Sequence, residues 1–370
     1  MNGRLPRISI LVPTFLPHDA IGNDVLGMRE AFRAAGYDAS ILAQFIHPAH
    51  QQYTRRVDLE SESTWQSEEN ILIYHHALYW PLGESILATT RNRVIIKYHN
   101  VTPAQFYLNY SDDLYTACRD GAEATRRLAR HPTAWFWADS AYNATELIEL
   151  GASSKRCHVA TPCHGIDEIA SAPLDAITVG AYRRTFNVLF VGALRPNKGH
   201  KKAIEVLSAY QGTQATDCRF IFAGSSDPNL RGYEDELQSF AAELRVERAV
   251  EFARCVNAAQ LRAYYLTADM FLCVSEHEGF CVPLVEAMYF RVPIVAWITS
   301  AVRETCGDAV RAFEQFDAAQ LAAAIAEYAQ NPHLARELAQ RGRARYESIF
   351  QLETIRARLL DLLRQVEQNV

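Results

Sequence analysis

The chain has 370 residues, of which 49% are hydrophobic and 22% charged, and its formal net charge at pH 7 is -6. This length accommodates two domains of ordinary size, and the composition is that of a globular protein rather than a disordered or fibrous one. The negative net charge argues against nucleic acid as a partner.

The eight cysteines are scattered, and none forms a C-x-x-C pair. Several lie inside apolar runs, as Cys273 does in the run 270–274. We therefore expect reduced thiols that fill the core, rather than a zinc site or a disulfide framework. The apolar stretch 8–12 is too short for the core of a signal peptide, and no apolar run reaches membrane-spanning length. These features predict a cytoplasmic protein.

Short β-branched runs alternate with helical patterns along the chain. The predicted strands lie at 8–12, 71–74, 94–98, 188–191, 220–223, 270–274 and 293–297, with amphipathic helical patterns at 24–35, 202–210 and 321–328. Near-continuous apolar strands with helices between them predict an α/β protein with parallel sheets covered on both faces.

The alternation restarts near residue 187, after a weakly periodic segment at 165–184. We therefore predict two Rossmann-like, doubly wound domains over 1–180 and 181–349. A helix at 350–370 is expected to pack back on the N-terminal domain. In such sheets ligands bind beyond the carboxyl ends of the strands, so the residues that follow each strand are the candidates for a site.

In the first half, the stretch after the first strand contains Gly22 and Asn23. It is not G-x-G-x-x-G, so the dinucleotide fingerprint is missing and a nicotinamide oxidoreductase is disfavoured. Two further strands end in histidines, His75 with His76 and then His99, which Asn100 follows. A histidine at a strand end serves structure or chemistry, and the residues alone leave both roles open.

A basic cluster at 126–131 comprises Arg126, Arg127, Arg130 and His131. Most such clusters are solvated faces. The sharper alternative is contact with an anionic lipid carrier or a membrane surface.

The second half opens with a strand and a loop that carries Gly192, Arg195 and Lys198. A guanidinium and an ammonium on such a loop can neutralise a leaving diphosphate without metal. The alternative is an ordinary charged surface loop. After the next strand, Gly224 either admits a nucleotide close to the backbone or serves a tight turn.

The segment 275–288 follows a strand and opens a helix, with Pro283 suited to the first helical position. The N–H groups there suit a phosphate or sugar hydroxyls, and Gly279 lets a ligand approach the backbone. Glu286 is expected in the first turn, where it either holds two ribose hydroxyls or only complements the helix dipole. Glu278, at the strand end, is suited either to hold donor sugar hydroxyls or to face developing positive charge.

The run Glu278-Gly279-Phe280, then Pro283 and Glu286, resembles the Glu-x7-Glu motif of retaining family 4 glycosyltransferases, which have the GT-B fold. The neighbouring segments 250–252, 261–269 and 303–309 resemble the same family. The resemblance runs from about 187 to 350 and implies two Rossmann-like domains facing across a cleft.

The resemblance also implies roles for particular residues. Those implied as catalytic are Glu278, His99, Lys198 and Arg195. Those implied for donor binding are Gly22, Gly192, Gly224, Gly279, Phe280, Cys281, Val282 and Glu286. Those implied on the acceptor side are Asn23, His75, His76 and Asn100. The chain departs from the family at Ala193, where arginine is usual, and at Arg303, where proline is usual; Arg195 is the candidate replacement.

The stretches 19–24 and 98–103 resemble bacterial mannosyltransferases of O-antigen and capsule assembly. The implied reaction is a retaining transfer of mannose from GDP-mannose onto a saccharide or a lipid-linked oligosaccharide. No cofactor and no metal are expected, because no Asp-x-Asp pair stands where a metal-bridged donor needs it. The implied partners are the nucleotide sugar and the saccharide acceptor, with peripheral contact at the cytoplasmic face of the inner membrane.

Other functions stay open at this point. The donor could be a UDP-sugar or another GDP-sugar, and a sugar-nucleotide epimerase would share the scaffold. An inactive sugar-binding scaffold protein is the alternative outside the enzymes, given Ala193 and Arg303.

Overall fold

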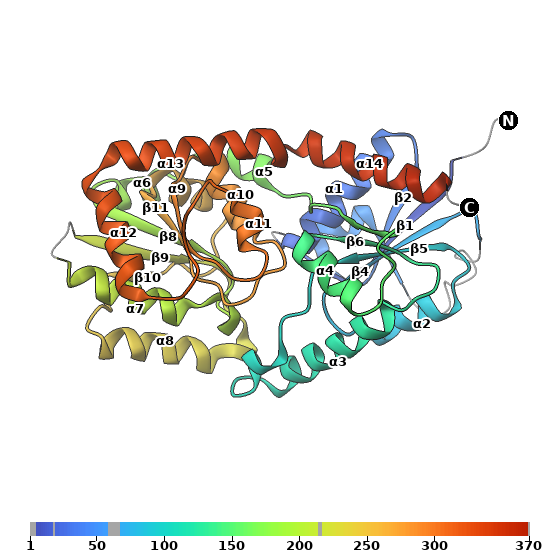
Figure 1. Ribbon diagram of the computed structural model, residues 1–370, viewed down its shortest axis with the longest axis horizontal. Coiled ribbons are helices and arrows are strands. Elements are labelled where there is room, and N and C mark those ends of the chain that lie inside the picture. The colour runs from blue at the N-terminus through green and yellow to red at the C-terminus, as the bar shows by residue number, and fades with distance from the viewer. Residues whose placement is uncertain (1–4, 18, 58–66, 214–216, 369–370) are drawn as a thin grey trace. The chain divides into compact units, whose positions relative to one another are not determined.

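A computed structural model describes residues 5–17, 19–57, 67–213 and 217–368. The chain forms two compact units. The first unit comprises Met1–Ala104, Thr116–Gly165 and Gln351–Val370, and the second comprises Gln105–Tyr115 and Ile166–Phe350. Each unit contains one parallel sheet with helices packed around it (Figure 1).

The sheet of the first unit has seven parallel strands in the order β3-β2-β1-β4-β5-β6-β7. Its strands are β1 (Arg7–Phe15), β2 (Asp38–Ile46), β3 (Thr54–Arg56), β4 (Ile71–His76), β5 (Arg93–Tyr98), β6 (Trp135–Ala138) and β7 (Cys157–Val159). Its helices are α1 (Ala20–Ala34), α2 (Pro81–Thr89), α3 (Asp112–Leu128), α4 (Ala141–Glu149) and α14 (Leu352–Gln368). The short 3-10 helix η1 (Pro48–Tyr53) also belongs to this unit, whereas η3 (Ala104–Tyr107) begins the segment 105–115 of the second unit.

The core of the first unit shows why these strands read as unbroken apolar runs. All six residues of β4 are buried, as expected for a central strand covered on both faces. The last helix, α14, belongs to this core: Leu359, Leu362 and Leu363 are fully buried beside β-strand residues such as Ile10. Helix α14 therefore contributes to the core of the unit that contains the first strand.

The sheet of the second unit has six parallel strands in the order β10-β9-β8-β11-β12-β13. Its strands are β8 (Phe186–Val191), β9 (Cys218–Ala223), β10 (Val250–Phe252), β11 (Met270–Cys273), β12 (Ile294–Trp297) and β13 (Arg311–Phe313). Its helices are α5 (Ile166–Ser171), α6 (Ala176–Tyr182), α7 (His200–Gln211), α8 (Arg231–Glu243), α9 (Ala258–Thr267), α10 (Val282–Tyr289), α11 (Val302–Cys306), α12 (Ala318–Gln330) and α13 (Pro332–Arg345). Shorter helical turns are η4 (Pro196–Lys198), η5 (Pro228–Leu230) and η6 (Tyr346–Phe350).

The division between the units differs from the expected boundary at 180. Residues 166–182 form α5 and α6, and both Ile166 and Tyr182 are buried in the core of the second unit. The short segment at 105–115 also belongs there, since the Tyr110 hydroxyl donates to Glu236 over 2.7 Å. Helices as short as α5 and α6 show little periodicity, which is why the sequence pattern places this boundary too late.

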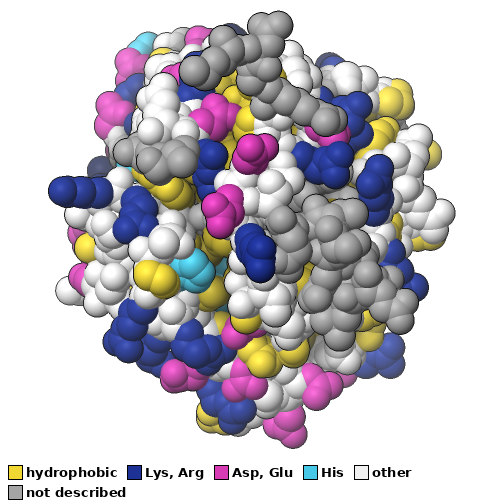
Figure 2. Space-filling view, turned by 90° about the vertical axis from the view of Figure 1, so that its right-hand side faces the viewer, with side chains coloured by type: hydrophobic (Ala, Val, Ile, Leu, Met, Phe, Trp, Pro, Cys, Tyr) yellow, Lys and Arg dark blue, Asp and Glu magenta, His cyan; other side chains and the backbone are white. Residues whose placement is uncertain are grey.

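The surface charges and the length and apolarity of the helices concern the membrane contact predicted above. Figure 2 shows one face of the first unit. Acidic and basic side chains are interspersed over the part of this face that is not grey. Among the helices that the structure describes, none combines the length and the apolarity needed to cross a bilayer.

Candidate active site

The strand order of the second unit brings Lys198 and Glu278 together, although they are 80 positions apart in the sequence. Lys198 ends η4, after β8, and Glu278 follows the neighbouring strand β11. The Lys198 ammonium donates to both oxygens of the Glu278 carboxylate, each over 2.9 Å. Burial opposes the charged ammonium, but Glu278 raises the pKa of Lys198 above its ordinary value, so the two form an ion pair.

The backbone around this pair is fixed on both sides. Gly199 has φ 77°, and a Cβ there would lie 2.0 Å from the Val274 carbonyl oxygen, so only glycine fits. The Asn197 carbonyl accepts from the Glu276 N–H over 2.8 Å, and the Glu278 N–H donates to Ser300 Oγ over 2.8 Å. Sequence reasoning missed Asn197 and Ser300.

A signal for each of them becomes clear only in the fold. Asn197 is 4% exposed in the structure. In the sequence, its signal is that it is a polar residue next to the candidate Lys198. Ser300 follows β12, another strand end of the same sheet edge, and its φ of 39° is visible only in the structure.

Glu286 differs from its expected position. Helix α10 begins at Val282, so Pro283 is its second residue and Glu286 its fifth, beyond the first turn. The reason is that Cys281 adopts the left-handed conformation, φ 73°, and ends the loop one residue earlier than the proline suggests. The charge of Glu286 therefore does not complement free N–H groups of a first turn.

Glu286 is instead a buried acid with one partner. It is 8% exposed, and the Tyr265 hydroxyl donates to its Oε2 over 2.6 Å. Burial raises the pKa of Glu286 to about 7, and the Tyr265 hydrogen bond offsets part of this effect. A carboxyl group that titrates near neutral pH is unusual and is typical of functional sites.

The other residues of the loop face inward. Phe280 and Cys281 are each 8% exposed and belong to the core of the second unit, with Phe280 edge-on to Phe350 at 5.8 Å between ring centroids. Val282 packs against the same core. Phe280, Cys281 and Val282 therefore contribute their side chains to the core rather than to a ligand.

The remaining donor-side candidates separate into two kinds. A Cβ at Gly192 would have its nearest neighbours at 3.8 Å, one of them Lys198 Cδ, whereas a Cβ at Gly224 would lie 1.9 Å from the Gly192 oxygen. Gly224 thus serves backbone packing. Arg195 lies 3.9 Å from Asp227 and is 42% exposed, so the structure pairs it with a different acid from Lys198.

Gly22 does not lie in a loop. It is within the first turn of α1, where its N–H donates to Asp19 Oδ2 over 3.1 Å. A Cβ there would lie 2.3 Å from the Leu16 carbonyl oxygen, so glycine is required by the chain itself. The Asp19 cap extends the helix by one turn beyond the amphipathic pattern predicted at 24–35, so Gly22, which the resemblance implies for donor binding, lies in a helix.

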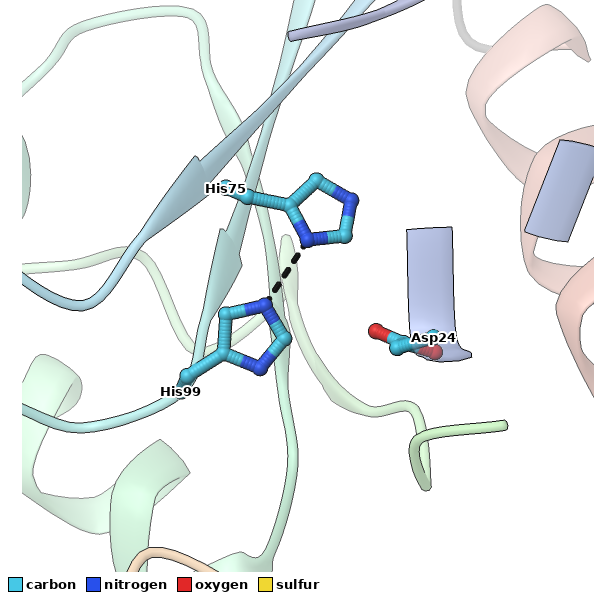
Figure 3. A group of neighbouring side chains, drawn as sticks. All are labelled: Asp24, His75 and His99. Carbon is cyan, nitrogen blue, oxygen red and sulfur yellow. Dashed lines mark hydrogen bonds between the residues drawn. The ribbon is translucent and has the colours of Figure 1, made fainter. Parts of the chain in front are cut away.

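In the first unit, three neighbouring strand ends assemble a polar cluster. His75 is the second-last residue of β4, His99 follows β5, and Asp139 follows β6. His99 Nδ1 lies 2.9 Å from Asp139 Oδ2, and His99 Nε2 lies 2.8 Å from His75 Nδ1. Figure 3 shows the two rings facing each other with Asp24 of α1 beside them.

A lysine balances this cluster. Lys97 is fully buried on β5, pairs with Asp139, donates to the Ala160 carbonyl over 2.7 Å and lies 3.6 Å from Asp24 Oδ2. Burial opposes ionisation of Asp139, but His99 and Lys97 hold its pKa below the ordinary value. Burial raises the pKa of Asp24. A lysine inside an apolar strand was the sequence signal for this cluster.

The cluster includes potential metal ligands. Asp24, His75 and His99 each offer one ligand atom, and these atoms lie within 4.8 Å of one another. Imidazole and carboxylate suit a divalent transition metal. The Lys97 ammonium, however, already supplies a positive charge beside Asp24, which disfavours a second cation at the same place.

Two acceptor-side candidates, His76 and Asn100, serve the interior. His76 points to the opposite face of β4 from His75, where its Nε2 lies 2.8 Å from Thr125 Oγ1. Asn100 is 7% exposed, and its amide donates to Asn143 over 2.8 Å.

Asn23 stays partly exposed on α1, beside Gly165. In the basic cluster, Arg126 pairs with Glu123 and Arg127 with Glu84, as on an ordinary solvated face.

Removing the buried lysine is expected to destabilise the first unit strongly. Lys97→Met leaves Asp24 and Asp139 buried together without a cation, which costs about 3–5 kcal/mol for a buried pair. Thermal and urea unfolding would measure the loss, with Lys155→Met at an exposed lysine of the same unit as the control. Equal stabilities of the two variants would contradict the ion-pair assignment.

Residues 179–345 match the family described as "Glycosyl transferases group 1". The D-inositol 3-phosphate glycosyltransferase of Acidothermus cellulolyticus is 30% identical over 198 residues, covering 49% of this chain and 42% of the relative. The GDP-mannose:cellobiosyl-diphosphopolyprenol alpha-mannosyltransferase of Xanthomonas oryzae pv. oryzae is 28% identical over 250 residues, covering 62% of this chain and 63% of the relative. The chain thus spans less than two thirds of the length of these relatives.

Solved structures match over nearly the whole chain. Anabaena HepE, in complex with UDP and glucose, aligns with a TM-score of 0.75 at 16% identity and covers 97% of this chain and 100% of its own. The sucrose-phosphate synthase of Thermosynechococcus elongatus aligns with a TM-score of 0.76 at 17% identity, covering 99% and 100%. At these identities the matches establish the fold, and they confirm the predicted GT-B class of two Rossmann-like domains. The residues that match the glycosyl transferases group 1 family, 179–345, lie in the second unit and include Lys198, Glu278 and Glu286.

Proposed function

We propose that the chain is a metal-independent glycosyltransferase that moves mannose from GDP-mannose, with retention, onto a saccharide or a lipid-linked oligosaccharide of a bacterial surface polysaccharide. The observation that carries this proposal is the Lys198–Glu278 pair at adjacent strand ends, with the buried acid Glu286 on the helix that follows. The choice of GDP-mannose is supported by the names of the relatives, among them the Xanthomonas mannosyltransferase.

In the proposed reaction, an acceptor hydroxyl attacks the anomeric carbon from the face that the diphosphate leaves. The bond from that carbon to the diphosphate oxygen breaks, and the hydroxyl proton passes to the leaving oxygen. Lys198 neutralises the charge that develops on the diphosphate, which is the largest electrostatic demand of such a step. Glu278, whose backbone Ser300 holds, orients the sugar and faces its positive charge.

Glu286 would hold the ribose of the donor. An ionised carboxylate has two oxygens that accept hydrogen bonds, which matches the two neighbouring ribose hydroxyls. In the structure the Tyr265 hydroxyl occupies one oxygen, Oε2, over 2.6 Å. The family resemblance also implies catalytic roles for His99, which pairs with Asp139 in the first unit, and for Arg195, which pairs with Asp227 in the second.

The location that we propose is the cytoplasm, with contact at the inner membrane face where the acceptor is lipid-linked. The basic cluster at 126–131 lends this contact little support, because Arg126 and Arg127 are paired with acids of the same unit.

The test is a donor panel. GDP-mannose, GDP-glucose, UDP-glucose and UDP-galactose would each be incubated with the protein, with and without EDTA, while thermal shift and hydrolysis are followed. We expect GDP-mannose to stabilise the protein and to be hydrolysed slowly, equally with EDTA, and both effects to disappear in Glu286→Ala. The matched control is Glu327→Ala, at an exposed glutamate of the same unit.

Each of the other results would indicate a different donor, reaction or function. The same pattern with a UDP-sugar would change the donor, and conversion of a nucleotide sugar without release of its sugar would indicate an epimerase. Loss of activity with EDTA would contradict the metal-independent reaction. No shift with any nucleotide sugar would leave the inactive scaffold.

A further inference from the structure

The imidazole of His99 has both ring nitrogens engaged inside the first unit. Nδ1 meets Asp139 Oδ2 at 2.9 Å, and Nε2 meets His75 Nδ1 at 2.8 Å. A neutral imidazole carries a single N–H, so one nitrogen donates and the other accepts. In the series Asp139, His99 and His75, the group at one end therefore determines which atom donates in every hydrogen bond.

That end is Asp139. Its Oδ1 accepts from the Lys97 ammonium, which has only donors to offer. An ionised carboxylate has only acceptors, so Oδ2 accepts the hydrogen bond that the N–H at His99 Nδ1 donates. His99 Nε2 must then accept from the N–H at His75 Nδ1. His75 Nε2 therefore carries no proton and is a hydrogen-bond acceptor.

His75 Nε2 has no hydrogen-bond partner among the residues that the structure describes, and the side chain is 2% exposed. Burial lowers the pKa of His75 well below its ordinary value, so the ring stays neutral. A buried acceptor without a donor is destabilising, and a hydroxyl from a ligand would satisfy it.

We propose that Asp139 and Lys97 are positioning residues that set the tautomers of His99 and His75, so that His75 Nε2 is presented as the acceptor for a hydroxyl of the bound saccharide. The identification of the ligand as a saccharide rests on the proposed function. The tautomers of His99 and His75 do not depend on it, and they can be measured without any substrate.

The variant Asp139→Asn inverts the chain while preserving its shape. Lys97 still requires an acceptor, so the amide oxygen takes the place of Oδ1 and the amide NH₂ faces His99 Nδ1. His99 Nδ1 must then accept, and its proton moves to Nε2, which donates to His75 Nδ1. The proton of His75 moves to Nε2, and the acceptor that the site presented becomes a donor.

The experiment uses the full chain labelled with ¹⁵N-histidine and records long-range ¹H–¹⁵N spectra at pH 8. His99→Gln and His75→Gln assign the two rings among the 12 histidines. We expect both rings to carry the proton on Nδ1 in the wild type and on Nε2 in Asp139→Asn. Asp24→Asn, which changes the other acid near Lys97 but does not contact His99 by a hydrogen bond, is expected to leave both tautomers unchanged.

The contrary results are equally definite. A wild-type His99 with its proton on Nε2 or on both nitrogens would overturn the proposal, as would Asp139→Asn spectra with unchanged tautomers. If Asp139→Asn does not fold, the wild-type spectrum alone decides. With donor and acceptor present, the inverted chain is expected to lower kcat by up to about 10⁴-fold, the loss that a wrong tautomer of a catalytic histidine can cause. Inverted tautomers with unchanged transfer would overturn the role of His75 at the saccharide.

Discussion

Lys198→Met is expected to lower kcat/KM for sugar transfer by about 10²–10³-fold, the effect of removing one group that stabilises transition-state charge. It also leaves the carboxylate of Glu278, which is 6% exposed, without its cation. A fully buried broken pair costs about 3–5 kcal/mol, and the 25% exposure of the Lys198 side chain reduces this to roughly 2 kcal/mol. Steady-state kinetics and urea unfolding measure the two effects separately.

A double variant separates catalysis from stability. Lys198→Met with Glu278→Gln removes both charges, so we expect the free energy of unfolding to return close to that of the wild type while transfer stays lost. Lys201→Met is the matched control, since Lys201 pairs with Glu236 at the surface over 2.7 Å. Recovery of transfer in the double variant would show that the pair only supports the fold.

Glu286→Gln is expected to change the pH dependence of stability. The pKa of Glu286 is raised from 4.5 to about 7 by burial, so the folded state disfavours the carboxylate. This group makes no difference below pH 4.5, where it is protonated in both states. Stability falls as the pH rises from 4.5 to 7, and the loss, at most about 3 kcal/mol, is complete above that.

The glutamine cannot ionise, yet it keeps a carbonyl acceptor for the Tyr265 hydroxyl. Relative to the wild type, the variant should therefore gain roughly 2–3 kcal/mol between pH 5 and pH 8, measured by urea unfolding at both values. Glu327→Gln, at an exposed position, should show no such gain. The same difference in stability at both pH values would contradict the buried-acid assignment.

Much of the fold follows from the sequence because parallel strands buried on both faces leave unbroken apolar runs. The strand at 71–74 and its histidines are an example, since all of β4 is buried. The boundary between the units was less predictable. Helices α5 and α6 are too short to show a period, and Tyr182 joins the second core only through tertiary packing.

The site shows the same division. That Lys198 and Glu278 each follow a strand is legible from the sequence, but their 2.9 Å contact depends on β8 and β11 being neighbours. The position of Glu286 could not be predicted, because the left-handed Cys281 decides where α10 begins. Likewise the chain from Asp139 to His75 needs β4, β5 and β6 side by side.

We propose that the second unit binds a nucleotide diphosphate sugar through Lys198 and its neighbours. Calorimetric titration of GDP-mannose into the wild type and into the Lys198→Met, Glu278→Gln variant tests it most directly, with Lys201→Met as the control. We expect saturable binding to the wild type and the control, and binding to the double variant that is weaker by about tenfold or more, as for the loss of one charge-assisted contact. Equal affinities in all three proteins would contradict the account.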